Sequence, residues 1–359
     1  MMMDKKALPL SGIRVLEFGA IGPGPYAAML LADFGAEILL IEREGGNGWP
    51  NPVVDRGRAR LTIDIRSDEG RDQVLALADK ADVIVEGFRP GVMERLGLGP
   101  EAVHARNPRL VYGRMTGWGQ TGPLARAAGH DLNYIAVTGA LAAMGTPGTP
   151  PPPPLNLVGD LGGGSTFLVM GILAALLERE RSGLGQVVDA AIVDGVNSMM
   201  GMFAGLPQSG KLRVAREHNV LAGATPFYRC YECADGRYVS VGPLEPKFFA
   251  ELLDRLGLPA ELAAEQENEA RWPEMVELFT KTFLTRPRDA WAERLEGSDV
   301  CFAPVIDLDE VPAHPHMADR GEIRNGLWYA APAPRLSRTP GVIAADADGE
   351  ARRAEWLAG

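Results

Sequence analysis

Short apolar runs alternate with stretches of helical periodicity over the first 120 residues of this chain. The runs that predict strands are 13–18, 37–42, 61–65, 82–86 and 110–116. Between them, apolar residues recur at a spacing of about 3.6 in 26–34, 68–81 and 91–105, which predicts helices. This alternation is typical of α/β proteins with a doubly wound, Rossmann-like parallel sheet.

The pattern changes further along the chain. Helices are predicted at 130–144, 161–179 and 190–203, and then a hairpin at 227–233 and 237–241 precedes helices at 246–256, 272–284 and 289–295. We therefore expect a large α/β domain (1–207), a polar linker (208–224), a smaller α+β domain (225–320) and a C-terminal segment (321–359).

Composition fits a soluble globular protein of two domains, with 46% hydrophobic and 23% charged residues in 359. The longest apolar run, 167–177, is too short to cross a bilayer and predicts a buried helix, so we expect no membrane partner. No signal peptide or peroxisomal address is evident, and a cytoplasmic location is expected.

The net charge of −11 argues against a nucleic-acid partner. The first 120 residues are nearly balanced, with 15 Lys and Arg against 16 Asp and Glu, so an anionic small ligand would be better received there. Cys230 and Cys233 have zinc-like spacing without a second pair, and with Cys301 they form no disulfide framework. We expect no metal site.

The loop Gly19–Pro25 follows the first predicted strand, as a nucleotide-phosphate loop would, and Glu42 ends the second strand where a ribose-binding acid would stand. However, the glycine spacing does not fit G-x-G-x-x-G and two prolines crowd the turn. A tight turn or a substrate-lining loop fits better than a nicotinamide dinucleotide site.

Six arginines follow or flank the ends of predicted strands, where parallel sheets bind ligands: Arg43, Arg56, Arg58, Arg60, Arg89 and Arg95. Their guanidinium groups could hold phosphates through bidentate hydrogen bonds. Solvated surface charge is the alternative for about half of them.

Two titratable residues stand at predicted helix starts. His130 lies between Gly129 and Asp131, where the helix dipole favours a neutral imidazole. Asp160 precedes Gly162-Gly163-Gly164 and is either a helix cap or a base beside free N–H groups that stabilise an oxyanion. Three glycines are costly in a helix and make sense where the backbone approaches a ligand closely.

These segments, with Met115–Pro123, resemble the α-methylacyl-CoA racemases of the family III CoA-transferase superfamily, from about Leu10 to Trp356. The resemblance implies interconversion of (2R)- and (2S)-2-methylacyl-CoA thioesters by 1,1-proton transfer through an enolate, without a metal or redox cofactor. His130 and Asp160 would be the two bases. The arginines and Gly117 would bind CoA, although many relatives read Arg-Gly-Lys-Arg-Ser where this chain has Arg56-Gly57-Arg58-Ala59-Arg60.

The resemblance further implies an interlocked homodimer in which Glu245 of one subunit orients His130 of the other. A methionine-rich stretch, Asn197–Phe203, is either core or an acyl-chain surface. The main alternative is a family III CoA-transferase with Asp131 as the nucleophile. A catalytically silent CoA-ester-binding protein is a third possibility.

Overall fold

The computed structural model describes residues 8–210 and 213–358, which form two compact units. The first contains the chain up to Thr138, residues 153–199 and the segment from Pro315 onward. The second contains Gly139–Pro152 and Met200–His314. These bounds differ from the predicted domains mainly because residues 139–152 and 200–207 belong to the second unit.

A six-stranded, wholly parallel sheet is the centre of the first unit, in the order β3-β2-β1-β4-β5-β6. The strands are β1 (Arg14–Phe18), β2 (Glu37–Glu42), β3 (Arg58–Thr62), β4 (Val83–Glu86), β5 (Val111–Thr116) and β6 (Val187–Ala191). This order is that of the Rossmann fold, so the predicted fold class is confirmed. The direction of winding reverses between β1 and β4, which makes their carboxyl ends the expected ligand site.

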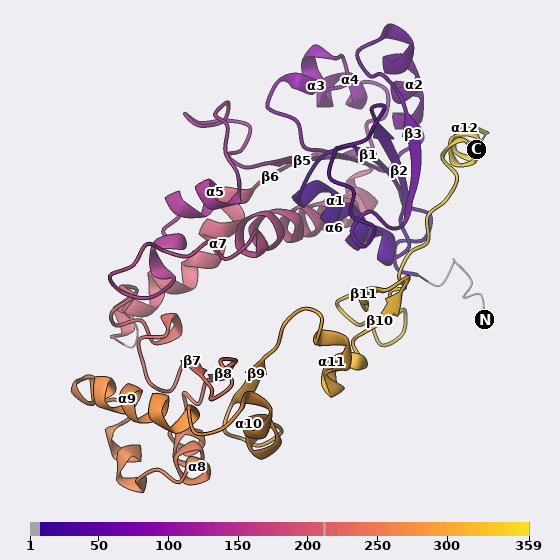
Figure 1. The fold of residues 1–359 in the computed structure, drawn as a ribbon. Coiled ribbons are helices and arrows are strands. Elements are labelled where there is room, and N and C mark those ends of the chain that lie inside the picture. The colour runs from indigo at the N-terminus through magenta and orange to yellow at the C-terminus, as the bar shows by residue number, and fades with distance from the viewer. Residues whose placement is uncertain (1–7, 211–212, 359) are drawn as a thin grey trace. The chain divides into compact units, whose positions relative to one another are not determined.

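Helices cover both faces of the sheet (Figure 1). The helices of this unit are α1 (Pro23–Asp33), α2 (Asp68–Ala78), α3 (Val92–Arg95), α4 (Pro100–His104), α5 (Asp131–Val137), α6 (Thr166–Ser182), the start of α7 (Ile192–Gly205), α11 (Pro315–Ala318) and α12 (Gly349–Ala358). A short hairpin, β10 (Gly321–Arg324) and β11 (Leu327–Ala330), precedes α12. On one face, α2 and Trp356 of α12 enclose a core with Leu16, Leu39 and Ile84. On the other, α6 packs on β5 and contacts α1.

The local differences from prediction have physical causes. β6 was not predicted because it is an edge strand with an exposed polar residue, Asp189, in its middle. β3 begins earlier than predicted because a charged residue, Arg58, lies buried within it. The predicted helix 130–144 stops at Val137 because the chain turns at Gly139 with a φ of 83°.

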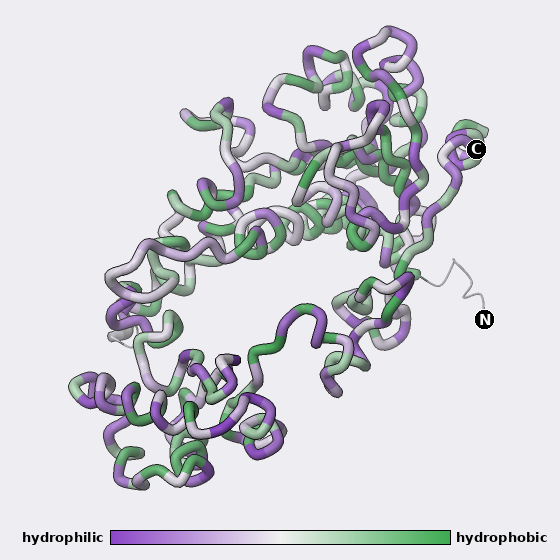
Figure 2. Tube along the Cα trace, viewed as in Figure 1, coloured by the Kyte–Doolittle hydropathy of each residue, from purple (hydrophilic) through white to green (hydrophobic). Residues whose placement is uncertain are grey.

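The helix α6 is not buried as predicted, since Met170, Leu173 and Leu177 are exposed. A nine-residue π-helix, Leu157–Ser165, runs directly into α6. By length and composition alone the combined 26-residue stretch could cross a membrane, which is weak evidence because core helices of soluble proteins pass the same test. Figure 2 colours the chain by hydropathy, and the apolar run 167–177 of α6 is mostly white to green there.

The second unit has its own core, built from aromatic and aliphatic residues of a three-stranded antiparallel sheet and three helices. Its longer elements are β7 (Arg229–Glu232), β8 (Tyr238–Val241), α8 (Pro246–Leu256), α9 (Trp272–Phe283), α10 (Arg288–Leu295) and β9 (Phe302–Val305). The predicted hairpin and helices are confirmed within a few residues, whereas β9 was not predicted.

Candidate active site

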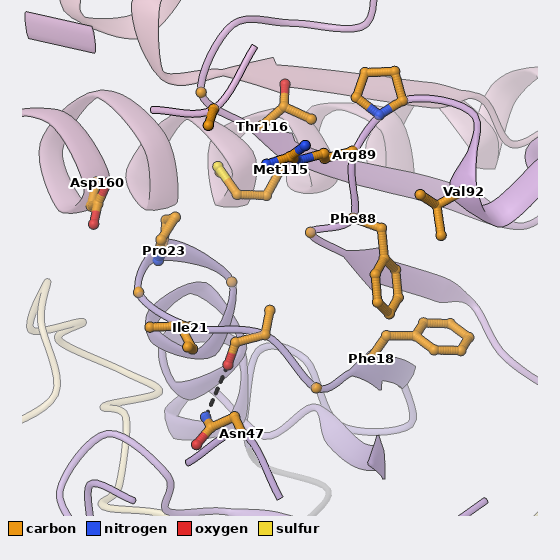
Figure 3. Close-up of a pocket in the computed structure, with 18 of the residues that line it drawn as sticks. Phe18, Ile21, Pro23, Asn47, Phe88, Arg89, Val92, Met115, Thr116 and Asp160 are labelled. Atoms are coloured by element: carbon orange, nitrogen blue, oxygen red, sulfur yellow. Dashed lines mark hydrogen bonds between the residues drawn. The ribbon is translucent and has the colours of Figure 1, made fainter. Parts of the chain in front are cut away.

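A cavity of about 880 Å³ lies at the carboxyl edge of the parallel sheet, where the winding reverses (Figure 3). It is lined by the segments that follow the strands: 18–24, 41–43, 46–47, 63–66, 87–90 and 115–118, with His130, Tyr134, Asp160 and Ile192 among the others. Residues 19–24 of the Gly19–Pro25 loop line this cavity, and a role in lining a substrate site stays a prediction. The side chain of Asn47 donates a hydrogen bond to the Ala20 carbonyl at 2.9 Å and steadies that loop.

His130 and Asp160 both line this cavity, although they come from different elements. His130 is the exposed residue immediately before α5, with an extended backbone (φ −133°, ψ 173°). Its N–H donates to the side-chain oxygen of Asn133 at 3.0 Å, which fixes the entry of the chain into the helix. The structure thus brings together the two residues that the sequence predicted as bases.

Asp160 belongs to the π-helix, a conformation that occurs frequently at functional sites. Burial raises the pKa of its carboxyl group; a hydrogen bond from Asn156, at 3.3 Å, opposes this rise. The charge of Asp131 raises the pKa further, and the charge of His130 lowers it. Asp160 therefore holds a proton more readily than an ordinary aspartate and is electrostatically coupled to His130.

Close to Asp160, the residue directly before α1 leaves little room for a side chain. A Cβ on Gly22, whose φ is 77°, would lie 3.0 Å from the Asp160 carboxylate. The Ser165 hydroxyl, which is fully buried, lies 2.8 Å from the Pro23 carbonyl and 3.0 Å from the Asp160 carbonyl. The π-helix is thereby tied to the loop that follows β1.

Asp131 does not face the cavity as a free carboxylate. It is 7% exposed, and its Oδ1 accepts the N–H of Asp160 at 2.6 Å. Burial raises its pKa, while backbone hydrogen bonds from Asp160 and Gly159 lower it. The expectation of free N–H groups around Asp160 is therefore wrong, because Asp131 takes the N–H of Asp160 and the Asn156 carbonyl takes that of Leu161.

The three glycines after Asp160 approach protein rather than an open ligand space. A Cβ on Gly163 would lie 2.5 Å from a methyl group of Val196 and 2.9 Å from its backbone nitrogen. One on Gly164 would lie 3.0 Å from Ile192 and 3.3 Å from Pro23. These glycines allow the π-helix to pack directly on α7 and α1, which corrects the interpretation that they admit a ligand.

Among the predicted arginines, Arg43 and Arg89 line the cavity and are exposed. Arg66 lines it as well, with a side chain that is 81% exposed, and sequence reasoning missed it. Its position after β3 was the available signal, because the predicted strand extended to residue 65.

The other predicted arginines lie elsewhere. Arg56 is paired with Asp33 at 2.6 Å and Arg58 with Glu17 at 2.6 Å, and all four side chains are buried. Their guanidinium groups are committed to internal partners, so we assign them to the stability of the fold. Arg60 borders a second cavity of about 200 Å³, where it pairs with Glu42, and Arg95 is exposed outside the large cavity lining.

The loop after β4 is held by buried charges that the sequence analysis did not identify. Glu86 accepts the Phe88 N–H at 2.7 Å and a hydrogen bond from Arg114 at 2.9 Å. Arg114 also pairs with Glu94 of α3 at 2.8 Å. This network fixes both ends of the loop that carries Arg89. Figure 3 shows Arg89 among the residues that line the cavity.

Gly117 lines the cavity, and because glycine has no side chain it leaves room for the aromatic ring of Tyr134. A Cβ at this position would overlap the ring of Tyr134.

Glu245 precedes α8 in the second unit and is exposed, and Met199 and Met202 of α7 are also exposed. No group of three or more His, Cys, Asp or Glu within residues 8–210 and 213–358 could hold a metal ion.

Comparison with known proteins gives consistent matches over nearly the whole chain. Residues 10–347 match CoA-transferase family III. The chain is 41% identical over 342 residues to alpha-methylacyl-CoA racemase of Mus musculus, covering 94% of this chain and 89% of the mouse protein. It is 38% identical over 338 residues to the Homo sapiens protein of that name, covering 93% and 88%. A crystal structure of a CAIB/BAIF family protein from Brucella suis matches with a TM-score of 0.82 and 27% identity, over 97% of this chain and 99% of that one.

Proposed function

Because this chain belongs to CoA-transferase family III, and its relatives include alpha-methylacyl-CoA racemases, we propose that it is an isomerase acting on 2-methylacyl-CoA thioesters. It interconverts the 2R and 2S forms by removing the α-proton on one face and returning a proton on the other. The step is redox-neutral, because a proton leaves and a proton returns, so it needs no redox cofactor.

The observation that carries this proposal is the pair His130 and Asp160, which line one cavity from different elements and are electrostatically coupled. In this account one group arrives as the base and the other arrives protonated, and the raised pKa of Asp160 suits it to hold the returning proton. General acid–base catalysis of this kind contributes about 10²–10⁴ in rate.

The thioester must also be held and its enolate stabilised. Arg43, Arg66 and Arg89 supply positive charge at the rim of the cavity for the phosphates of CoA. Hydrogen-bond donors placed at the enolate oxygen would meet the second requirement. Donors aimed at such an oxygen typically contribute about 3–4 kcal/mol each.

Asp131 argues for racemisation over CoA transfer. A transferase nucleophile must reach the thioester carbonyl, whereas this carboxylate is buried and accepts the backbone N–H of Asp160. Incubation with an acyl-CoA followed by hydroxylamine is expected to leave activity intact. Inactivation with modification of Asp131 would favour the transferase instead.

Substitution of each base tests the proposal directly. We expect His130→Ala and Asp160→Ala each to abolish racemisation while CoA-ester binding, measured by calorimetry, changes by less than about threefold. Loss of binding in both variants would point to a structural role for the two residues.

We also propose that the protein is a homodimer whose subunits share the site, with Glu245 of one subunit orienting His130 of the other. The exposed apolar residues of α6 and α7, such as Met170, Leu177 and Met202, are the kind of surface that a second chain covers. Analytical ultracentrifugation giving the mass of one chain would contradict this arrangement.

A further inference from the structure

We propose that Tyr134 is a positioning residue that holds His130 against one face of the substrate and has no equivalent effect on Asp160. This inference rests on the proposed two-base function. It concerns a side chain that the sequence analysis did not single out.

Tyr134 is bonded to the residue directly before His130. Its hydroxyl donates to the carbonyl of Gly129, so the bond restrains the peptide that carries the histidine. Since Tyr134 lies one turn into α5, the same helix that begins after His130 also secures its approach. The peptide unit between Gly129 and His130 is thus held at both of its polar groups, with its N–H bound to Asn133 and its carbonyl to Tyr134.

The ring of Tyr134 is itself tightly enclosed. It lies directly over Gly117, where any Cβ would overlap it, and it meets Trp118 edge to face with ring centroids 4.8 Å apart. A Cβ on Gly129 would lie 2.8 Å from the Tyr134 ring and 3.1 Å from the Trp118 ring. The two glycines and two aromatic rings form an aromatic clamp (Gly117, Trp118, Gly129 and Tyr134) that sets the place of His130.

Asp160 is held by different contacts. Its N–H is bound by Asp131, its carboxylate by Asn156, and its carbonyl lies beside the Ser165 hydroxyl. Burial raises the pKa of the Tyr134 hydroxyl, and the charge of Asp160 raises it further. The hydroxyl therefore keeps its proton and donates it to the Gly129 carbonyl in a hydrogen bond. Each base therefore has its own support, and loosening the clamp should affect one face of the substrate.

Exchange of the α-proton in D2O separates the two faces. In a two-base enzyme, His130→Ala retains exchange only for the enantiomer that Asp160 deprotonates, because Asp160 returns a deuteron to the same face. Asp160→Ala retains exchange only for the other enantiomer. These two variants assign each enantiomer to its base, whichever face of the substrate each base contacts.

Tyr134→Phe keeps the ring in the clamp and removes only the hydroxyl. We expect it to slow exchange of the enantiomer assigned to His130 about tenfold and to change the other by less than about twofold. Gly117→Ala, which displaces the ring, should show the same selectivity. Tyr329→Phe is the matched control, because it also removes a bond from a tyrosine hydroxyl to a carbonyl, that of Pro52, outside the cavity lining.

Equal slowing of both enantiomers by Tyr134→Phe, or slowing only of the one assigned to Asp160, would overturn the inference. Thermal unfolding of each variant identifies general damage, which would slow both. Absence of exchange for either enantiomer with the unmodified protein would instead refute the proposed function itself, so the two failures are distinguishable.

Discussion

Replacing Arg58 by methionine is expected to destabilise the fold and to leave CoA-ester affinity unchanged. The Arg58 guanidinium donates to both carboxylate oxygens of Glu17, at 2.6 and 3.0 Å. It also donates to the carbonyls of Pro25, Val54 and Arg56. Arg58 is 1% exposed, so none of these groups can turn to water when the guanidinium is lost.

The magnitude follows from that burial. Removing one partner of a buried ion pair leaves the other charge uncompensated and costs about 3–5 kcal/mol. For a unit of this size the loss corresponds to a decrease in Tm of roughly 6–20 °C. Changing Glu17 to leucine as well removes the stranded carboxylate, so the double variant should be more stable than Arg58→Met alone.

The assay compares the Tm, by circular dichroism, with the KM for an acyl-CoA. Arg66→Ala is the contrasting variant, since Arg66 lines the cavity with an exposed side chain. It should raise KM about tenfold, through loss of a charge-assisted hydrogen bond, at unchanged Tm. A raised KM for Arg58→Met with the Tm of the unmodified protein would refute this reasoning and restore Arg58 as a ligand residue.

Three further outcomes are expected. Asn156→Ala removes the hydrogen bond that lowers the pKa of Asp160. In the direction of reaction that needs ionised Asp160, the pH below which kcat/KM falls should therefore move upward. A downward move would contradict the role of Asn156. Gly163→Ala should reduce unfolding free energy by about 1–3 kcal/mol in urea titrations, because its Cβ meets the backbone of Val196, and an unchanged midpoint would count against direct packing. Asp131→Ala removes the acceptor of the Asp160 N–H, so it should lower kcat about tenfold with little change in KM. Full activity of this variant would show that the contact is dispensable.

The sequence was sufficient to predict the alternation of strands and helices and to single out His130 and Asp160, which line one cavity. Periodicity reports how each segment divides its polar and apolar faces, and His130 and Asp160 each stand at a boundary between a polar loop and an apolar run. The order of the strands in the sheet decides which carboxyl ends lie side by side. The strand β6 was not predicted, because an edge strand needs no continuous apolar run.

The arginines show why the remainder could not be predicted. Arg58 and Arg66 are both charged residues near the same strand, yet one is buried against Glu17, 41 positions earlier, and the other faces the cavity. Whether such an arginine is buried or lines the cavity depends on the residue that it contacts in the folded chain. That contact is set by the fold and cannot be read from the local sequence. The glycines at 162–164 were recognised as a close approach, but the sequence could not identify the neighbour as α7.

Proton NMR of a single enantiomer of a 2-methylacyl-CoA, incubated with the protein in D2O, tests the central claim most directly. We expect deuterium at C2 together with formation of the opposite configuration. A thioester that binds but keeps both its α-proton and its configuration would contradict the claim that His130 and Asp160 act on the two faces of one carbon.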